Sequence, residues 1–184
     1  MKDSSEIKKQ FSHLGQDLID EIFAVSVIKE FPKNTDLIKP GQYVKVVPVV
    51  LSGLVKVFTR YDDKELLLYY IQPEESCIMS FSACITGSKS KIHAITEEES
   101  NVILIPSDKL AGWVTQFAAI NKLFYQQFDL RYTDLIDTIN RLFFDKLDKR
   151  LLDYLSEKAA LKGKNPVKIS HREIAGDLGT AREV

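Results

Sequence analysis

The last fifteen residues of the chain have the residue types and spacing that say most about its chemistry. Ser170 and Glu173 show the S/T-x-x-E spacing of a helix capping box, and Thr180 and Glu183 repeat that spacing. Gly179 lies between the two boxes, where a glycine supplies the tight turn that joins two helices at a steep angle. This pattern predicts a helix-turn-helix, whose chemistry is the recognition of nucleic acid.

Other reactive residue types are few and scattered. The histidines are His13, His93 and His171, and no nucleophile elbow, phosphate-binding glycine loop or metal-ligand spacing accompanies them. Cys77 and Cys84 lie in an apolar stretch with a spacing that fits neither a disulfide framework nor a CxxC metal site. We therefore expect reduced structural thiols, no metal, no cofactor and no enzymatic activity.

Charge is unevenly distributed along the chain. The formal net charge is −1, but residues 141–184 carry ten Lys/Arg against seven Asp/Glu, whereas residues 1–140 carry a net charge of −4. A basic C-terminal module on a slightly acidic body fits an anionic partner such as DNA. The alternative is that the C-terminal charges only form a solvated face.

The bulk properties describe an ordinary globular protein. A length of 184 residues with 45% hydrophobic residues predicts one or two domains with a packed core. The first ten residues lack the apolar region of a signal peptide, and no apolar run is long enough to cross a bilayer. We expect a cytoplasmic protein without a membrane partner.

Two periodicities organise the chain as far as residue 108. Apolar residues recur at three- and four-residue intervals from Ile7 to Ile28 and predict helices with a break near Gly15. After Pro32, β-branched and aromatic runs separated by turn residues predict a small antiparallel sandwich or barrel, an all-β body at about residues 30–108. The expected strands are Thr35–Ile38, Tyr43–Val50, Gly53–Phe58, Leu66–Ile71, Lys91–Thr96 and Asn101–Pro106.

A short helix is expected at Leu110–Phe117, and a long one from Asn121 to about Phe144, where Gly and Pro are absent. A heptad-like seam runs along it: Tyr125, Phe128, Tyr132, Leu135, Ile139 and Leu142. Other apolar residues lie off this seam: Leu123, Phe124, Leu130, Ile136 and Phe143. The seam could pack on the β body or form a parallel contact between two chains, and two apolar faces favour two partners.

The C-terminal region begins with another amphipathic helix. We expect it at Asp148–Lys162, followed by a turn at Gly163–Pro166 and a short extended segment at Val167–Ile169. The residues expected to face inward are Leu151, Leu152, Leu155 and Ala159.

This order of elements resembles the Crp/Fnr family of bacterial transcription regulators. Asp36–Gly41 is similar to the family's glycine turn at the start of the β-roll, and Val50–Val57 resembles its φ-x-x-G-x-φ-x-φ hairpin strand. Leu66–Pro73 resembles the strand and turn that follow, and Phe144–Leu155 the hinge and first helix of the DNA-binding domain. Order and spacing together make the resemblance specific over nearly the whole chain.

The resemblance implies an α+β fold, with an N-terminal antiparallel β-roll (a cupin-like jelly roll) and flanking helices. It implies an effector-sensing domain at residues 1–118, a dimerisation helix at 119–145 and the start of a winged helix-turn-helix at 146–184. We expect the recognition helix to continue past Val184. The implied partners are DNA with a two-fold symmetric site, a second copy of the chain, a small effector and RNA polymerase.

The resemblance also assigns residues to DNA contacts. Arg182 and Glu183 would begin the recognition helix, where an arginine fork suits guanine and a glutamate accepts from cytosine. The alternative for Glu183 is a capping role, and His171 and Arg172 could be plain surface residues. Ala181 lacks the hydroxyl that is often found at its position. The full implied set is Ser170, His171, Arg172, Thr180, Ala181, Arg182 and Glu183.

The effector pocket departs from the cyclic-nucleotide pattern of the family. Ser80 replaces the glutamate that engages ribose, Ser90 replaces the arginine that neutralises the phosphate, and Lys91 beside it lacks the arginine fork. Leu135 and Ile136 stand where the long helix would contact the base and offer no hydrogen bonds. We predict weak or no binding of cyclic AMP. The pocket could hold another small anion or metabolite, or be a filled remnant: Ser80, Ser82, Cys84, Thr86, Ser90 and Lys91.

Two functions compete on these grounds. The first is a sequence-specific DNA-binding regulator that acts as a homodimer under an effector other than cyclic AMP. The second is a small-molecule sensor or interaction module whose DNA-binding half is degenerate. The sequence expected after Val184 would distinguish these two hypotheses, because a basic helix with another Arg or Lys one turn on supports the regulator.

Overall fold

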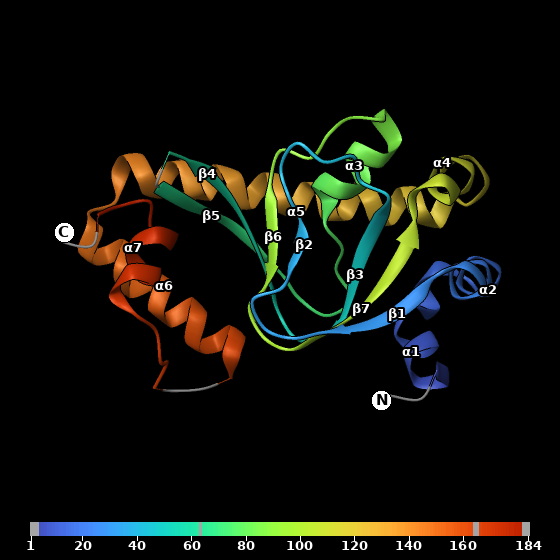
Figure 1. The fold of residues 1–184 in the computed structure, drawn as a ribbon, viewed down its shortest axis with the longest axis horizontal. Helices are drawn as coiled ribbons and strands as arrows, with labels where there is room; N and C mark the ends of the chain where they lie inside the picture. The colour runs from blue at the N-terminus through green and yellow to red at the C-terminus, as the bar shows by residue number, and fades with distance from the viewer. Residues whose placement is uncertain (1–3, 63, 164–165, 182–184) are drawn as a thin grey trace. The chain divides into compact units, whose positions relative to one another are not determined.

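The computed structural model describes residues 4–62, 64–163 and 166–181, which fold into two compact units (Figure 1). The first unit comprises Met1–Val57 and Tyr69–Arg131, and the second comprises Phe58–Leu68 and Tyr132–Val184. The expected α+β class with antiparallel sheets and a long helix is confirmed.

The chain begins with short helices that cover the first sheet. These are α1 (Ser4–Gln10), the 3₁₀ turn η1 (Ser12–Leu14) and α2 (Gln16–Val25). The predicted break near Gly15 is confirmed, because η1 ends and α2 starts on either side of it. Helix α2 ends at Val25, and the next residue, Ser26, donates its backbone N–H to the carbonyl of Ile22.

Seven strands among the described residues form two antiparallel sheets. The first sheet has the order β1-β7-β3 and the second the order β2-β6-β4-β5, so the strand order is far from sequential, as in a jelly roll. Strands β4 and β5 each have residues in both units. The bounds are β1 (Val27–Phe31), β2 (Asp36–Ile38), β3 (Val46–Ser52), β4 (Val55–Tyr61), β5 (Lys64–Ile71), β6 (His93–Thr96) and β7 (Ser100–Pro106).

Strand β1 corrects one prediction. The helical pattern was expected to run to Ile28, but Val27 and Ile28 pair with Leu104 and Ile103 of β7. Both residues are β-branched and stay more than a third exposed, so their side chains do not continue the buried face of α2. Periodicity alone cannot separate the end of a helix from a short strand. Here, the hydrogen bonds to β7 make residues 27–31 a strand.

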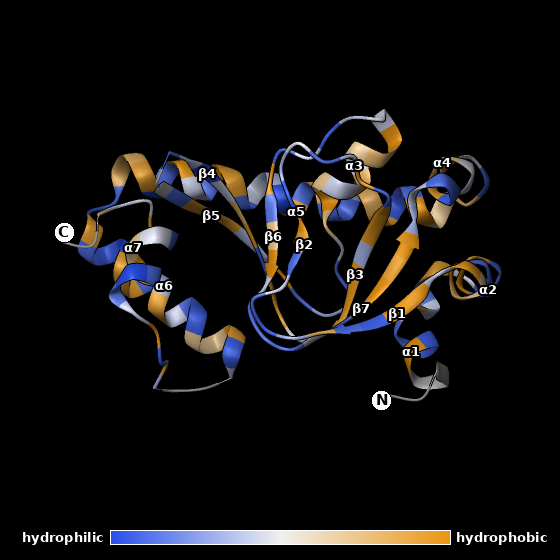
Figure 2. Cartoon of the chain, viewed as in Figure 1, coloured by the Kyte–Doolittle hydropathy of each residue, from blue (hydrophilic) through white to orange (hydrophobic). Residues whose placement is uncertain are grey.

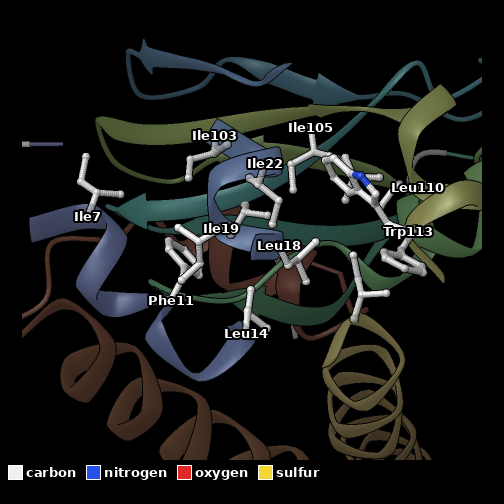
Figure 3. Close-up of a cluster of buried hydrophobic side chains, with 14 of the residues drawn as sticks. Ile7, Phe11, Leu14, Leu18, Ile19, Ile22, Ile103, Ile105, Leu110 and Trp113 are labelled. Atoms are coloured by element: carbon white, nitrogen blue, oxygen red, sulfur yellow. The ribbon is translucent and has the colours of Figure 1, made fainter. Parts of the chain in front are cut away.

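The core of the first unit lies between the N-terminal helices and the β1-β7-β3 sheet (Figure 3). Val47, Val49 and Leu51 of β3 belong to this cluster, whereas Val50, between them in sequence, is fully buried on the opposite face. Burial of β3 on both faces explains why its sequence is a nearly continuous apolar run. The neighbouring strand β7 is also mainly hydrophobic (Figure 2).

Helices close the first unit and lead out of it. Helix α3 (Ile78–Thr86) follows β5, and α4 (Ser107–Gln116) follows β7. Trp113 of α4 is buried, and its Nε1 donates to Glu21 Oε2 over 2.8 Å, which ties α4 to α2. The long helix α5 (Ala118–Phe144) then confirms the helix expected over residues 121–144.

The second unit contains α6 (Leu147–Lys162) and α7 (His171–Asp177). The face expected to point inward on α6 was partly wrong, since Leu152 is 65% exposed while Tyr154 and Lys158 are buried. A search for apolar periodicity selects leucines, but here the polar ends of Tyr154 and Lys158 find buried partners on α7.

Candidate functional site

Helix α7 begins with the predicted capping box, which is confirmed. Glu173 donates its backbone N–H to Ser170 Oγ over 3.2 Å, and Glu173 Oε2 accepts from the backbone N–H and the hydroxyl of Ser170 over 2.9 and 2.8 Å. These bonds satisfy N–H groups that a helix start leaves without intrahelical partners. The start of α7 is thus fixed at His171.

The turn after α7 contains the glycine conformation that the predicted helix-turn-helix needs. Gly179 lies in the left-handed region with φ of +66°, and Thr180 donates its N–H back to the carbonyl of Ala175 over 2.9 Å. A Cβ added at Gly179 would lie 3.3 Å from Leu66 Cδ1 of the β4–β5 hairpin, inside the second unit. Both the backbone conformation and this close approach favour glycine.

The residues proposed for DNA contacts lie at the two ends of this motif. His171 and Arg172 are exposed in the first turn of α7, and Ala181 is exposed after the turn. Thr180 is half-buried, and Ser170 is occupied by its cap. Arg182 and Glu183, the two base-reading candidates, lie outside the described residues, as does the second capping box that Glu183 would complete.

The six effector-pocket candidates are spread between buried and exposed positions. Ser80 is 1% exposed, and its Oγ makes no hydrogen bond to the described residues. Ser90 is buried and donates its hydroxyl to the carbonyl of Ile92 over 3.1 Å. Thr86 and Lys91 are exposed, whereas Ser82 and Cys84 are half-buried. Whether these six side chains hold a ligand stays a prediction.

The thiol at Cys84 donates to the carbonyl of Val44 over 3.5 Å. Burial raises the pKa of Cys84 to about 11 and also raises the pKa of the fully buried Cys77. Since the thiolate is the nucleophile and metal ligand, both thiols are suited to packing.

A cavity of about 40 Å³ lies inside the core cluster of the first unit. Its walls are apolar side chains of the N-terminal helices, β3, β7 and α3 to α5, with Ser76 and Gln127 among the few polar groups. None of the six effector candidates lines it. A water needs roughly 10–15 Å³ in this measure, so the cavity is too small for a nucleotide.

A polar network connects the β5–α3 turn to α5, and sequence reasoning missed it. Gln127 Oε1 accepts from the backbone N–H and the hydroxyl of Ser76 over 3.0 and 2.9 Å. One turn later on α5, the Arg131 guanidinium pairs with Glu75 and lies 4.5 Å from the centroid of the Tyr69 ring. No sequence pattern indicates this network, because the burial of Gln127, and hence its need for hydrogen-bond partners, is known only from the fold.

The predicted seam of α5 is exposed within the chain. Its side chains are between 38% and 68% exposed, whereas the off-seam residues Leu123 and Phe124 pack against the core. The other off-seam residues, Leu130, Ile136 and Phe143, are also more than a third exposed. Large apolar side chains in such a row are typical of a surface that a partner covers.

None of the described helices combines the length and the apolar composition needed to cross a bilayer. Among the described residues, no group of three or more His, Cys, Asp or Glu side chains is placed to hold a metal ion.

Comparison with known proteins identifies the fold. Residues 28–116 match the cyclic nucleotide-binding domain family. A transcriptional regulator of the Crp/Fnr family from Eubacterium rectale superposes with a TM-score of 0.84 at 22% identity, over 94% of this chain and 81% of that one. The c-di-GMP responsive global regulator CLP of Xanthomonas campestris gives 0.77 at 21% identity, over 91% and 87%.

A Crp/Fnr family regulator from Thermus thermophilus superposes with a TM-score of 0.70 at 19% identity, over 85% of this chain and 80% of that one. A search of curated protein sequences found no match.

Proposed function

The chain contains a cyclic nucleotide-binding domain and has the fold of Crp/Fnr transcription regulators, and from this premise we propose that it is a sequence-specific DNA-binding regulator. It acts in the cytoplasm as a regulator and not as an enzyme. The observation that carries the proposal is the capped helix α7 with its left-handed turn at Gly179, placed after a long helix in the order of that fold.

The DNA contacts divide into two classes. Arg182 and Glu183 read base edges at the start of the recognition helix, and the exposed His171 and Arg172 contact phosphate at the start of α7. The net charge of +3 on residues 141–184 supports an anionic partner for this half of the chain.

Dimerisation through the α5 seam supports a two-fold symmetric operator. The exposed, heptad-spaced side chains of the seam suit a parallel contact with the same helix of a second copy. Two recognition helices would then read half-sites about one helical turn apart.

The effector is a small molecule other than cyclic AMP. Ser80 and Ser90 replace the charged residues of the usual cassette, and both are buried. Native mass spectrometry of freshly purified protein tests for a copurifying ligand. Because the Xanthomonas regulator responds to c-di-GMP, that dinucleotide should be included among the ligands whose masses are sought. A promoter-bound activator of this type would also contact RNA polymerase.

The DNA-binding proposal is tested by selecting binding sites from random DNA with the full-length protein. A palindromic consensus is expected, and Arg182→Ala should weaken binding by about 1–3 kcal/mol at one base pair of each half-site. A uniform loss over all sequences would reassign Arg182 to phosphate. Without any preference over random DNA at moderate salt, the alternative of a sensor with a degenerate DNA-binding half is supported instead.

A further inference from the structure

Three residues of α6 reach the end of α7 at one-turn intervals. Arg150, Tyr154 and Lys158 are four residues apart and therefore lie on one face of α6. The Arg150 guanidinium donates to the carbonyl of Leu178. The Tyr154 hydroxyl donates to Asp177 Oδ2 over 2.7 Å, and Lys158 Nζ lies 3.5 Å from the same oxygen. All of these contacts lie within the second unit.

The ion pair in this group is almost fully removed from water. Lys158 is 2% exposed and Asp177 is 4% exposed, whereas Lys149 on the same helix forms an exposed pair with Asp145. Burying two charges is costly, and a pair of apolar side chains of similar volume is often at least as stable. Stability therefore does not explain why these two charges are here, and fixing one relative placement of two helices would explain it.

The contacts converge on the residues that determine the direction of the chain after α7. Asp177 is the last residue of α7, and Leu178 begins the turn that Gly179 completes with its positive φ. The last carbonyls of a helix lack intrahelical partners and attract cations, which is the role of Arg150 at Leu178. The base-reading candidates of the proposed function, Arg182 and Glu183, come next in the sequence after this turn.

We propose that Arg150, Tyr154 and Lys158 form a clamp, the α6 clamp, that fixes the exit of the chain from α7 and so positions the recognition helix. These are positioning residues, since they act through Asp177 and the Leu178 carbonyl. The inference rests on the proposed DNA-binding function. An apolar replacement would keep the two helices packed but leave several placements of the turn similar in energy.

The decisive variant is the double substitution Lys158→Met and Asp177→Leu in the full-length protein, with Lys149→Met as the matched control on an exposed position of the same helix. Three quantities are measured: the thermal midpoint, amide hydrogen exchange at residues 178–180, and affinity for the selected operator relative to random DNA at one salt concentration. The double variant should stay folded, because the buried charges are replaced together, and its thermal midpoint should fall only slightly, because the Tyr154 hydroxyl loses its acceptor at Asp177.

In the same variant, exchange at the turn should become about tenfold faster and the preference for the operator over random DNA should fall about tenfold, as expected for the loss of charge-assisted hydrogen bonds. Lys149→Met should leave the exchange and the preference unchanged. A folded double variant with parental exchange and parental preference would overturn the clamp.

If the double variant does not fold, Tyr154→Phe decides the matter, because it removes only the hydroxyl that donates to Asp177. Faster exchange at residues 178–180 supports the clamp, and unchanged exchange overturns it. A parent protein that lacks operator preference contradicts the proposed function, while the exchange measurement still tests the clamp.

Discussion

At the scale of single residues, the thiols show how packing controls reactivity. Burial raises the pKa of Cys84 from 9.0 to about 11, so the neutral thiol is favoured in the folded state. That preference contributes stability below pH 9, and the contribution is lost as the pH rises towards 11. The chemistry of the site is therefore that of an apolar contact at neutral pH.

We predict that iodoacetamide modifies Cys84 about 100-fold more slowly than a free thiol at pH 8, because roughly one thiol in a thousand is ionised there. The rate should rise about tenfold per pH unit until the pH approaches the pKa of about 11. Mass spectrometry of a Cys77→Ala variant isolates the signal of Cys84. Modification at the rate of a free thiol would contradict the burial of this side chain.

The glycine in the turn after α7 allows a second prediction at this scale. Gly179→Ala should cost about 1–2 kcal/mol for the left-handed backbone, because an L side chain is disfavoured there. The contact with Leu66 at 3.3 Å should add to that cost. Thermal and urea unfolding of the two single alanine variants, at Gly179 and Gly163, separate the two effects.

Gly163 is the matched control, with φ of +58° and no atom within 4 Å of an added Cβ. Its alanine variant should show only the backbone cost. Equal losses at Gly163 and Gly179 would mean that the Leu66 side chain moves aside freely. A partial recovery of stability is expected when Leu66→Ala is combined with Gly179→Ala.

At the scale of elements, the seam of α5 makes the dimer testable. Leu135→Asp places two carboxylates in a symmetric apolar contact, one from each copy, so the dissociation constant should rise at least about 100-fold. Sedimentation velocity over a concentration series measures it. Asn140→Asp adds the same charge at an exposed off-seam position of the same helix and should leave the dimer intact. An unchanged dimer in Leu135→Asp would exclude the seam as its interface.

At the same scale, some elements could be predicted from local sequence patterns and others could not. The seven residues of α7 and their cap followed from Ser170 and Glu173, because a capping box is a local motif. Strand β1 did not follow, because its residues pair with residues of β7 that are about seventy positions away in sequence. The buried face of α6 was missed for a related reason, since Asp177, the ion-pair partner of the buried Lys158, belongs to another helix.

The candidate site divides in the same way. The turn at Gly179 was predictable from its glycine, whereas the bonds from Ser76 to Gln127 join the β5–α3 turn to the middle of α5. Hydrogen bonds between segments fifty residues apart leave no spacing pattern for a single sequence to reveal. The buried charge pair of the α6 clamp belongs to this second kind.

At the scale of the whole molecule, the β-roll and the C-terminal region match the Crp/Fnr pattern to different degrees. The capping box of α7 and the turn at Gly179 match the predicted helix-turn-helix, while Ser80 and Ser90 stand where the family resemblance would place charged residues. Ser80 is enclosed in α3 and Ser90 is bonded to its own strand entry at Ile92. The C-terminal region therefore matches the family pattern more closely than the candidate effector pocket does.

We therefore predict that cyclic AMP and cyclic GMP, at about 1 mM, release no heat on titration into the full-length protein and leave its thermal midpoint unchanged. A bound cyclic phosphate needs an arginine fork or an equivalent set of donors in a desolvated site, whereas Lys91, the cation next to Ser90 in sequence, is exposed at the surface. If a ligand copurifies with the protein, its mass identifies it, and titration of that ligand serves as the positive control. A dissociation constant below about 10 μM, which is roughly 7 kcal/mol of binding, would require Ser80 and Ser90 to leave their buried positions and would contradict this account of the β-roll.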